Sequence, residues 1–298
     1  MQDGYYARTA SRDCKGVFVE DVTEEIPAKA KAKRNPSAPD YGPWVPDFLI
    51  KTLKAISIAA LVVTAATAFV FGNVPIGIAL AVVTLVALCV TFYLMQVKKL
   101  FRPGRNSIMT KLHHHLLERL SWDGEGVLLD TGAGNGELAI RCAFTYSNAR
   151  VFASDRWNRG FAEWGYSLWQ CRENARIEDV AERVEFVPAS ADGLDFEDGT
   201  FDAVVSCFVR MDTGYEEKKR EQLFEAFRVL KEGGRFSLMG MFAHRELYGD
   251  MNVLIAELQK LGVSELHYEP DVASLDFVPG FARLPLMVRR AGLLYGVK

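Results

Sequence analysis

Two long stretches without a charged residue dominate the first third of the chain. They cover residues 55–71 (AISIAALVVTAATAFVF) and 74–95 (VPIGIALAVVTLVALCVTFYLM), and only Gly72-Asn73 separates them. As helices rising about 1.5 Å per residue, they would measure roughly 25 and 33 Å, close to the about 30 Å of a bilayer's hydrocarbon core. The pattern therefore predicts two membrane spans joined by a tight turn, which is a transmembrane hairpin.

Two other interpretations of these stretches fit less well. A pair of buried core helices in a soluble protein is the first, but two charge-free runs of this length in succession are typical of spans. A cleaved signal peptide is the second, but its apolar run would lie close to the N-terminus. Small residues at helical spacing would let the two helices approach closely; they are Ala60, Thr64, Ala68, Gly77 and Ala81.

Positive charges give the hairpin an expected orientation. They flank both of its outer ends, whereas the short turn has none; they are Lys51, Lys54, Lys98, Lys99, Arg102 and Arg105. Because lysine and arginine accumulate on the cytoplasmic side, both ends and everything after residue 105 should face the cytoplasm.

The hairpin divides the chain into three expected parts. Residues 1–47, rich in Lys, Pro, Ser and Gly, read as a disordered cytoplasmic tail. Its basic residues either touch anionic lipid headgroups or are simply solvated, and Trp44 would lie near the bilayer interface. Residues 48–105 are the hairpin, with spans of about 55–72 and 74–96. Residues 106–298 form the remaining domain.

Charge and cysteine content exclude two classes of site. The net charge is −3, which favours no nucleic-acid surface. The five cysteines are scattered with no CxxC pair, so neither a metal centre nor a disulfide framework is expected.

A helix is expected directly after the hairpin. Within residues 107–120, Ile108, Leu112, Leu116 and Leu120 recur at every fourth position, the period of one helix face. The run His113-His114-His115 resembles a metal tract, but successive helical residues point about 100° apart and cannot converge on one ion. We expect no metal there.

From residue 126 onward, apolar runs alternate with helical patterns. Expected strands cover 127–130, 149–155, 183–189, 201–207, 235–241, 264–270 and 291–297. Expected helices cover 137–147, 163–175 and 215–234, the last ending at Gly233. Such alternation indicates a doubly wound α/β fold, with helices on both faces of a mostly parallel, seven-stranded, Rossmann-like sheet.

The stretch VLLDTGAGNGELAI, residues 127–140, is the clearest ligand-binding signal. Its glycines Gly132, Gly134 and Gly136 are spaced G-x-G-x-G, not the G-x-G-x-x-G of dinucleotide folds, and no Gly-Lys-Ser/Thr follows as in a P-loop. Asp130 and Glu137 flank the loop. Two carboxylates at a helix N-terminus oppose a phosphate and favour a ligand with positive charge. Asp155, at the end of the next strand, can accept hydrogen bonds from a ribose.

Three stretches, which cover the regions of the first, of the third and fourth, and of the fifth expected strand, resemble in order the motifs of one family. "DTGAGNG" is similar to the first motif of class I S-adenosylmethionine-dependent methyltransferases, and "VEFVPASADGLDFEDGTFDAVVS" and "AFRVLKEGGRFSLMG" are similar to later blocks of the same family. The ubiquinone and menaquinone methyltransferases carry the same blocks. The resemblance covers roughly residues 107–298. It implies a Rossmann-like fold, S-adenosylmethionine as cofactor and methyl transfer as the activity.

The resemblance also implies roles for individual residues. Asp130 and the loop backbone would hold the methionine part of the cofactor, Asp155 the ribose, and Arg156 and Trp157 would lie beside the adenine. Where relatives carry a G-D-A triplet, this chain has Ala189-Ser190-Ala191, with Asp192 as a substitute for the missing acid. The full set of expected cofactor-binding residues is Asp130, Thr131, Gly132, Ala133, Gly134, Gly136, Asp155, Arg156, Ser190, Ala191, Asp192, Ser206 and Cys207.

The chemistry of the acceptor is less marked. Methyl transfer is an in-line displacement that needs alignment and, for some acceptors, a base. The candidates are Asp212, Tyr215 and His244, with Arg210 for an acidic acceptor; each is equally an ordinary polar loop residue. No N-P-P-Y motif follows the fourth strand, which favours a small molecule over a nucleic acid.

Three aromatic residues and one apolar segment stay open. Trp157, Trp164 and Trp169 form either core packing or an aromatic wall over the ligand. Residues 271–290 either lie at the membrane interface, cover the cleft, or pack as an ordinary connection.

Three functions from different classes remain. A membrane-anchored methyltransferase for a small, lipid-like or amphipathic acceptor fits best. The alternatives are a non-catalytic S-adenosylmethionine-binding sensor and an NAD-dependent oxidoreductase.

Overall fold

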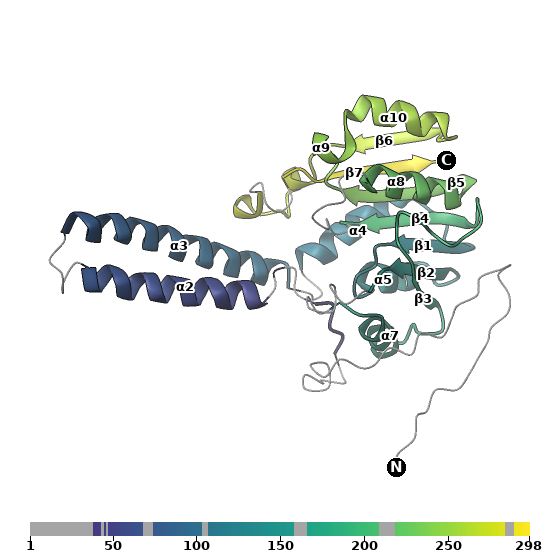
Figure 1. Cartoon of the computed structure of the whole chain (residues 1–298). Coiled ribbons are helices and arrows are strands. Elements are labelled where there is room, and N and C mark those ends of the chain that lie inside the picture. Colours follow the sequence, from purple (N-terminus) through teal and green to yellow (C-terminus); the bar gives the residue numbers. More distant parts are fainter. Residues whose placement is uncertain are drawn as a thin grey trace, which may run out of the picture.

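The computed structural model describes residues 38–42, 45, 47–67, 74–102, 107–157, 166–208, 218–283 and 289–298. Within these ranges, two long helices lie side by side and project from an α/β domain (Figure 1). The helices are α2 (Asp47–Ala65) and α3 (Val74–Leu100), and both are long and apolar enough to cross a membrane by length and composition. The predicted turn at Gly72-Asn73 lies outside the described residues.

Hydroxyl groups join the two helices at the predicted close approach. Thr64 Oγ1 lies 3.0 Å from Thr84 Oγ1, and Ser57 Oγ lies 3.3 Å from Thr91 Oγ1. Thr64, Thr84 and Thr91 also donate to the carbonyl four residues earlier. An apolar surrounding offers polar groups no water, so such internal satisfaction is what a spanning pair requires.

The domain is a seven-stranded sheet in the order β3-β2-β1-β4-β5-β7-β6. Strands β1 to β5 run parallel, and β7 is antiparallel to both of its neighbours. This confirms the predicted Rossmann-like, mostly parallel sheet. The strands are β1 (Val127–Thr131), β2 (Arg150–Asp155), β3 (Val184–Pro188), β4 (Phe201–Cys207), β5 (Leu230–Gly240), β6 (Glu265–Glu269) and β7 (Gly292–Val297).

Helices cover both faces of the sheet, each over its own apolar core. One core contains the buried sides of α4 (Ile108–Leu120), α5 (Glu137–Thr145) and α7 (Leu168–Ile177). The other contains those of α8 (Lys218–Val229), α9 (Arg245–Tyr248) and α10 (Met251–Lys260). Two short 3-10 helices, η2 (Val272–Ser274) and η3 (Gly280–Arg283), precede β7. Leu129 belongs to one core and its neighbour Leu128 to the other, as the alternation of a central strand requires.

The helix predicted after the hairpin is α4, and its apolar face is the predicted one. Ile108, Leu112, Leu116 and Leu120 are all buried. Ser107 caps the helix, since its hydroxyl accepts from the amide of Thr110 at 3.0 Å. The helix begins at Ile108, eight residues after α3 ends at Leu100, and packs onto the sheet, where Ser237 Oγ of β5 donates to the carbonyl of Leu116 at 2.7 Å.

Two helix boundaries differ from the sequence prediction. The helix expected to reach Gly233 ends at Val229, because Leu230 already pairs with Phe201 in the sheet. The helix expected from residue 163 begins at Leu168, where Ser167 caps it. Helix α10 was not predicted. The tail also differs: residues 38–42 hydrogen-bond to α7, whereas we expected disorder.

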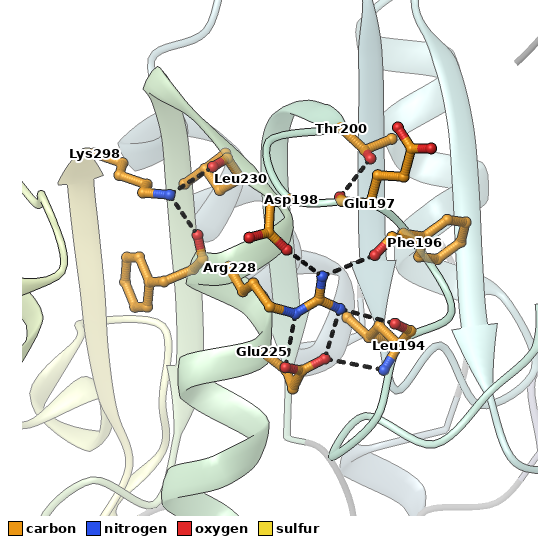
Figure 2. Close-up of polar contacts among 10 residues, drawn as sticks. Leu194, Phe196, Glu197, Asp198, Thr200, Glu225, Arg228, Leu230 and Lys298 are labelled. Atoms are coloured by element: carbon orange, nitrogen blue, oxygen red, sulfur yellow. Dashed lines mark hydrogen bonds and ion pairs between the residues drawn. The ribbon is translucent and has the colours of Figure 1, made fainter. Parts of the chain in front are cut away.

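Arg228 closes the end of α8 against the β3–β4 connection (Figure 2). Its guanidinium donates to the carbonyls of Leu194 and Phe196, each at 2.8 Å, and to the carboxylates of Glu225 and Asp198. Beside it, Lys298 Nζ donates to the carbonyls of Phe227 and Leu230, both at 2.9 Å. The "AFRVLKEGG" block thus connects the β3–β4 connection and the C-terminus to α8.

Candidate functional site

A cavity of about 400 Å³ lies at the carboxyl ends of β1, β2, β4 and β5. In an open α/β sheet this is the edge where ligands bind, at the reversal of strand order between β1 and β4. The volume falls in the range of small-molecule pockets. Of the residues expected to bind cofactor, those that line it are Asp130, Thr131, Gly132, Ala133, Gly134, Asp155, Ala191, Ser206 and Cys207.

The glycine loop after β1 uses its amides internally. Those of Gly132 and Ala133 donate to the carbonyl of Ser154 at 2.7 and 3.0 Å, and that of Gly134 donates to Asp155 Oδ2 at 2.8 Å. A phosphate-binding loop turns such donors toward its ligand, so this loop is not one. Gly136 has a φ of 82°, and a Cβ there would lie 2.9 Å from the Phe186 ring, so the loop needs glycine at this position.

Carboxyl groups make one end of the cavity acidic. Asp130 is 1% exposed, and its Oδ2 has no hydrogen-bond partner among the described residues. Burial, and secondarily Asp155, raise the pKa of Asp130 to about 8. Burial also raises the pKa of Asp155 and Glu137, opposed by backbone amides and by Arg141 respectively. An unpartnered buried carboxyl in such a setting suits a cationic ligand.

Four of the expected cofactor residues do not line the cavity. Gly136 caps α5. Arg156 lies beside the site and joins the other two: its Nε donates to Ser190 Oγ at 2.8 Å and its Nη2 to Asp192 Oδ1 at 3.0 Å. The Arg156 bridge therefore positions the β3 loop that carries Ala191 into the cavity.

The catalytic candidates are not assembled by the described residues. Asp212 and Tyr215 lie outside them, as does Arg210. His244 does not line the cavity; its Nε2 lies 2.9 Å from Arg290 Nη1, and its Nδ1 lies 3.6 Å from Glu246.

Comparison with known proteins relates this chain to methyltransferases. The family model described as "Methyltransferase domain" matches residues 128–234. The chain is 38% identical over 109 residues to the Ubiquinone/menaquinone biosynthesis C-methyltransferase UbiE of Brucella anthropi, over 36% of this chain and 38% of that protein. It is 31% identical over 140 residues to the same enzyme of Salmonella arizonae, over 45% of this chain and 52% of that protein.

The chain carries a class I S-adenosylmethionine-dependent methyltransferase domain. It spans between 38% and 52% of the length of these curated relatives. Among solved structures, the geranyl diphosphate C-methyltransferase of Streptomyces coelicolor matches with a TM-score of 0.46 at 14% identity, over 64% of this chain and 79% of that one. The phosphoethanolamine N-methyltransferase 2 of Haemonchus contortus matches with 0.45 at 15% identity, over 63% and 52%.

The methyltransferase domain gives its cavity a second, apolar end. Its apolar lining comes mainly from α8, β5 and α9, by Leu223, Ala226, Leu238, Phe242, Leu247 and Tyr248, and α8 also contributes the polar residues Lys219 and Gln222. The rings of Phe242 and Tyr248 pack with centroids 4.9 Å apart, and burial raises the pKa of the Tyr248 hydroxyl. Sequence reasoning missed this end, because its side chains come from three elements and share no motif.

The methyltransferase cavity is also lined by residues that flank the hairpin. They are Tyr41 and Gly42 before α2, Phe101 after α3, and Met109 and His113 on α4. His113 is 3% exposed, and its Nδ1 has no hydrogen-bond partner among the described residues, 4.0 Å from Glu137 Oε1. Burial, and secondarily Arg141, lower the pKa of His113 to about 3, so its imidazole is neutral.

The three consecutive histidines therefore have three environments. His113 faces the cavity, His114 is exposed beside Glu118, and His115 Nε2 lies 2.8 Å from Glu269. The helical period indicates that the three side chains cannot share one direction. It does not single out His113, because positions 113 and 115 flank the Leu112–Leu116 face equally.

Two of the three tryptophans considered in the sequence analysis, Trp157 and Trp169, are described by the structure. Trp157 is buried, its indole donates to the carbonyl of Gly134 at 2.6 Å, and it meets Phe186 edge-on. Trp169 is half-buried, and neither residue lines the cavity. Core packing, not an aromatic wall, describes Trp157; Trp164 lies outside the described residues.

Proposed function

We propose that this chain transfers the methyl group of S-adenosylmethionine to a small, amphipathic or lipid-like acceptor at a membrane surface. One observation carries the proposal: a single cavity joins an acidic end at the glycine loop to an apolar end at α8 and α9, and residues flanking the hairpin cover it. The acidic end suits the sulfonium and ammonium groups of the cofactor. The apolar end suits the body of a hydrophobic acceptor.

The cofactor is proposed to lie along the carboxyl ends of the parallel strands. Asp130, with its unpartnered Oδ2, would accept from the ammonium group, and Asp155 from the ribose hydroxyls. Ser206 and Cys207, at the end of β4, would face the sulfur. The β3 loop, with Ala191 held by the Arg156–Ser190–Asp192 bridge, would meet the adenine.

His113 is proposed as the neutral polar side chain nearest to the reacting end. It shares the cavity with Asp130, Glu137 and Cys207, and it has an unpartnered ring nitrogen. A buried polar atom without a partner is costly, and a bound ligand would supply one. Asp212 and Tyr215 stay predictions for a base on the β4–α8 loop.

The membrane is proposed to hold this site at its surface. Lys51 and Lys54 on α2 and Lys98 and Lys99 on α3 lie at the ends of the helices that face the domain (Figure 1). Positive residues at those ends favour a cytoplasmic methyltransferase domain. The proposed organisation is a tail over 1–47, the hairpin over 48–105 and the domain over 106–298, with residues 38–42 of the tail packed against α7 of the domain.

Turnover with labelled cofactor would test the proposal. The full chain, purified in detergent, is incubated with methyl-labelled S-adenosylmethionine and a lipid extract, and label is counted in the organic and aqueous phases. We expect transfer to an organic-soluble product, lost in Asp155→Asn. Transfer only to aqueous products would contradict the lipid-like acceptor. Tight cofactor binding without any transfer, over a range of extracts, would indicate the sensor instead.

A further inference from the structure

A short segment ahead of the hairpin lies across the glycine loop. We call residues 38–42 the strap. Two of its residues, Tyr41 and Gly42, line the cavity together with Gly134 and Asn135 of the loop. Gly42 has a φ of 78°, and a Cβ there would lie 3.1 Å from Asn135 Nδ2. The strap backbone at Gly42 therefore lies against the Asn135 side chain of the loop, at a distance that favours glycine.

One buried side chain holds the strap in place. Asn174 on α7 is 0% exposed, and its amide uses every hydrogen-bonding position it has. Its Nδ2 donates to the carbonyls of Asp40 and Asn135, both at 2.9 Å. Its Oδ1 accepts from the backbone amide of Asp40 at 2.8 Å and from Gln170 Nε2 at 2.9 Å. We call this set of bonds the clamp.

The clamp makes the strap part of the fold rather than a loose terminus. A buried amide is costly unless it is fully paired, and half of the pairing of Asn174 comes from Asp40. The same amide binds Asn135, a residue of the glycine loop. Strap, loop and α7 are thus joined through one side chain.

Tyr41 is oriented by its hydroxyl. The oxygen donates to Glu178 Oε1, at 3.4 Å, at the C-terminal end of α7. With its hydroxyl engaged there, the half-buried side chain contributes its remaining surface to the cavity. Aromatic side chains supply large contact areas at low cost in conformational entropy, which suits a ligand-covering position.

The strap leads directly into the hairpin. Val45 is 3% exposed and belongs to the same core cluster as Ile50 of α2, Val97 of α3 and Phe101. Phe101 is 1% exposed and itself lines the cavity. The two ends of the hairpin therefore meet beside the cavity. The strap, which the clamp holds at Asp40, lies just before the first helix of the hairpin.

We propose that the strap is a ligand-covering wall of the site, that Tyr41 is a binding residue for the cofactor, and that the clamp sets how slowly the ligand leaves. Bound cofactor dissociates when the strap releases from Asn174. The proposal rests on the proposed function, because that function supplies the ligand.

Dissociation kinetics test the role of Tyr41. The full chain in detergent is loaded with S-adenosylhomocysteine, and release is followed by tryptophan fluorescence after dilution or displacement. Tyr41→Ala should dissociate about tenfold faster, the size of a modest hot-spot contact. Tyr41→Phe, which keeps the ring but loses the hydrogen bond to Glu178, should release the ligand at a rate between those of wild type and Tyr41→Ala. Tyr295→Ala, a half-buried tyrosine on β7 outside the cavity, is the matched control and should leave release unchanged.

The clamp is tested separately. Asn174→Ala, and replacement of residues 38–42 by a Gly-Ser segment of equal length, should each accelerate release at least as much as Tyr41→Ala. A chain that carries both Asn174→Ala and the replaced strap should release the ligand little faster than either single change, because both changes act on one contact. If Asn174→Ala does not fold, the replaced strap alone decides. Wild-type release rates in Tyr41→Ala and in the replaced strap would overturn the proposal. Failure of the wild-type chain to bind S-adenosylhomocysteine would instead contradict the proposed function.

Discussion

The two walls of the cavity are built in different ways. The glycine-loop wall comes from one short stretch, residues 130–135 and Glu137, together with Asp155 at the end of the adjacent strand. The hairpin wall consists of Tyr41, Phe101, Met109 and His113, which become neighbours only because the chain leaves for the hairpin and returns beside the same strands. The first wall is local in sequence, whereas the second is assembled by tertiary packing.

Their chemistry differs as well. The glycine-loop wall presents carboxyl groups of raised pKa and keeps its amides for itself. The hairpin wall presents apolar and aromatic surface and one neutral imidazole. We infer that the first wall determines which cofactor binds, and that the second determines how long it stays and what else can enter. Four predictions test this difference between the walls. They are ordered from the largest expected effect on cofactor affinity to the smallest.

Asp155→Asn should weaken S-adenosylhomocysteine binding about 100-fold, because it removes a buried, hydrogen-bonded charge from the glycine-loop wall. Asp155 accepts from the amides of Gly134 and Arg156, so loop order is lost together with the proposed ribose contact. Calorimetric titration measures the change. Asp250→Asn, at the cap of α10 and outside the cavity, is the control, since asparagine caps a helix as well as aspartate. Equal cofactor affinities for the two variants would contradict the proposal that the glycine-loop wall binds the cofactor.

Cofactor affinity should rise with pH, about tenfold between pH 7 and about pH 9. In the free protein the pKa of Asp130 is about 8, so the carboxyl is protonated at lower pH. A cation beside it favours the carboxylate, so binding releases a proton and is opposed below the free-state pKa. Titration of S-adenosylmethionine in buffers of different ionisation enthalpy detects that proton.

The raised pKa of Asp130 should also make the stability of the fold depend on pH, and this stability should fall as pH rises, whereas the cofactor affinity rises. A raised folded-state pKa stabilises the fold at low pH, and this contribution is lost as pH rises toward about 8. Asp130→Asn should therefore flatten both the affinity profile and this part of the stability profile. A pH-dependent affinity that persists unchanged in Asp130→Asn would show that another group titrates.

His113→Leu should weaken cofactor binding or turnover about five- to tenfold without lowering stability. The imidazole loses its proposed ligand contact, but the fold loses only a buried polar group with an unpartnered nitrogen, which is close to neutral for stability. Thermal unfolding and turnover are measured together. His114→Leu, exposed on the next position of the same helix, should change neither. Lower stability with unchanged turnover would assign His113 to packing alone.

Arg228→Met should leave cofactor affinity unchanged while lowering the free energy of unfolding by about 2–4 kcal/mol. The change leaves the carbonyls of Leu194 and Phe196 and the Glu225 carboxylate without their guanidinium partner, whereas Asp198 is exposed to water. Neither Arg228 nor these partners line the cavity. Denaturant unfolding measures it. Arg176→Met, which breaks the ion pair of an exposed arginine with Glu173, should leave the free energy of unfolding nearly unchanged. A loss of cofactor affinity in folded Arg228→Met would show that the cavity depends on the contact between α8 and the β3–β4 connection.

Much of the fold could be predicted because its signals are local. The seven strands, the order of helices and the face of α4 follow from periodicity and from turn residues. The misses also have physical reasons. Helix α10 carries its signals, an Asp250 cap and Leu254 and Leu258 at helical spacing, but the segment is short. Leu230 continues a helical pattern in sequence and joins the sheet because Phe201 pairs with it.

The sequence by itself determined the glycine loop, its flanking carboxyls and the apolar runs of the hairpin, because each depends on residues within a few positions of one another. Only the tertiary structure decided that one histidine of three faces the cavity, and that Asn174 binds a segment more than a hundred residues away. Such pairings depend on where the chain returns after the hairpin, and no local period or spacing encodes that return. The residues that cover the ligand are therefore those that sequence reasoning could not place.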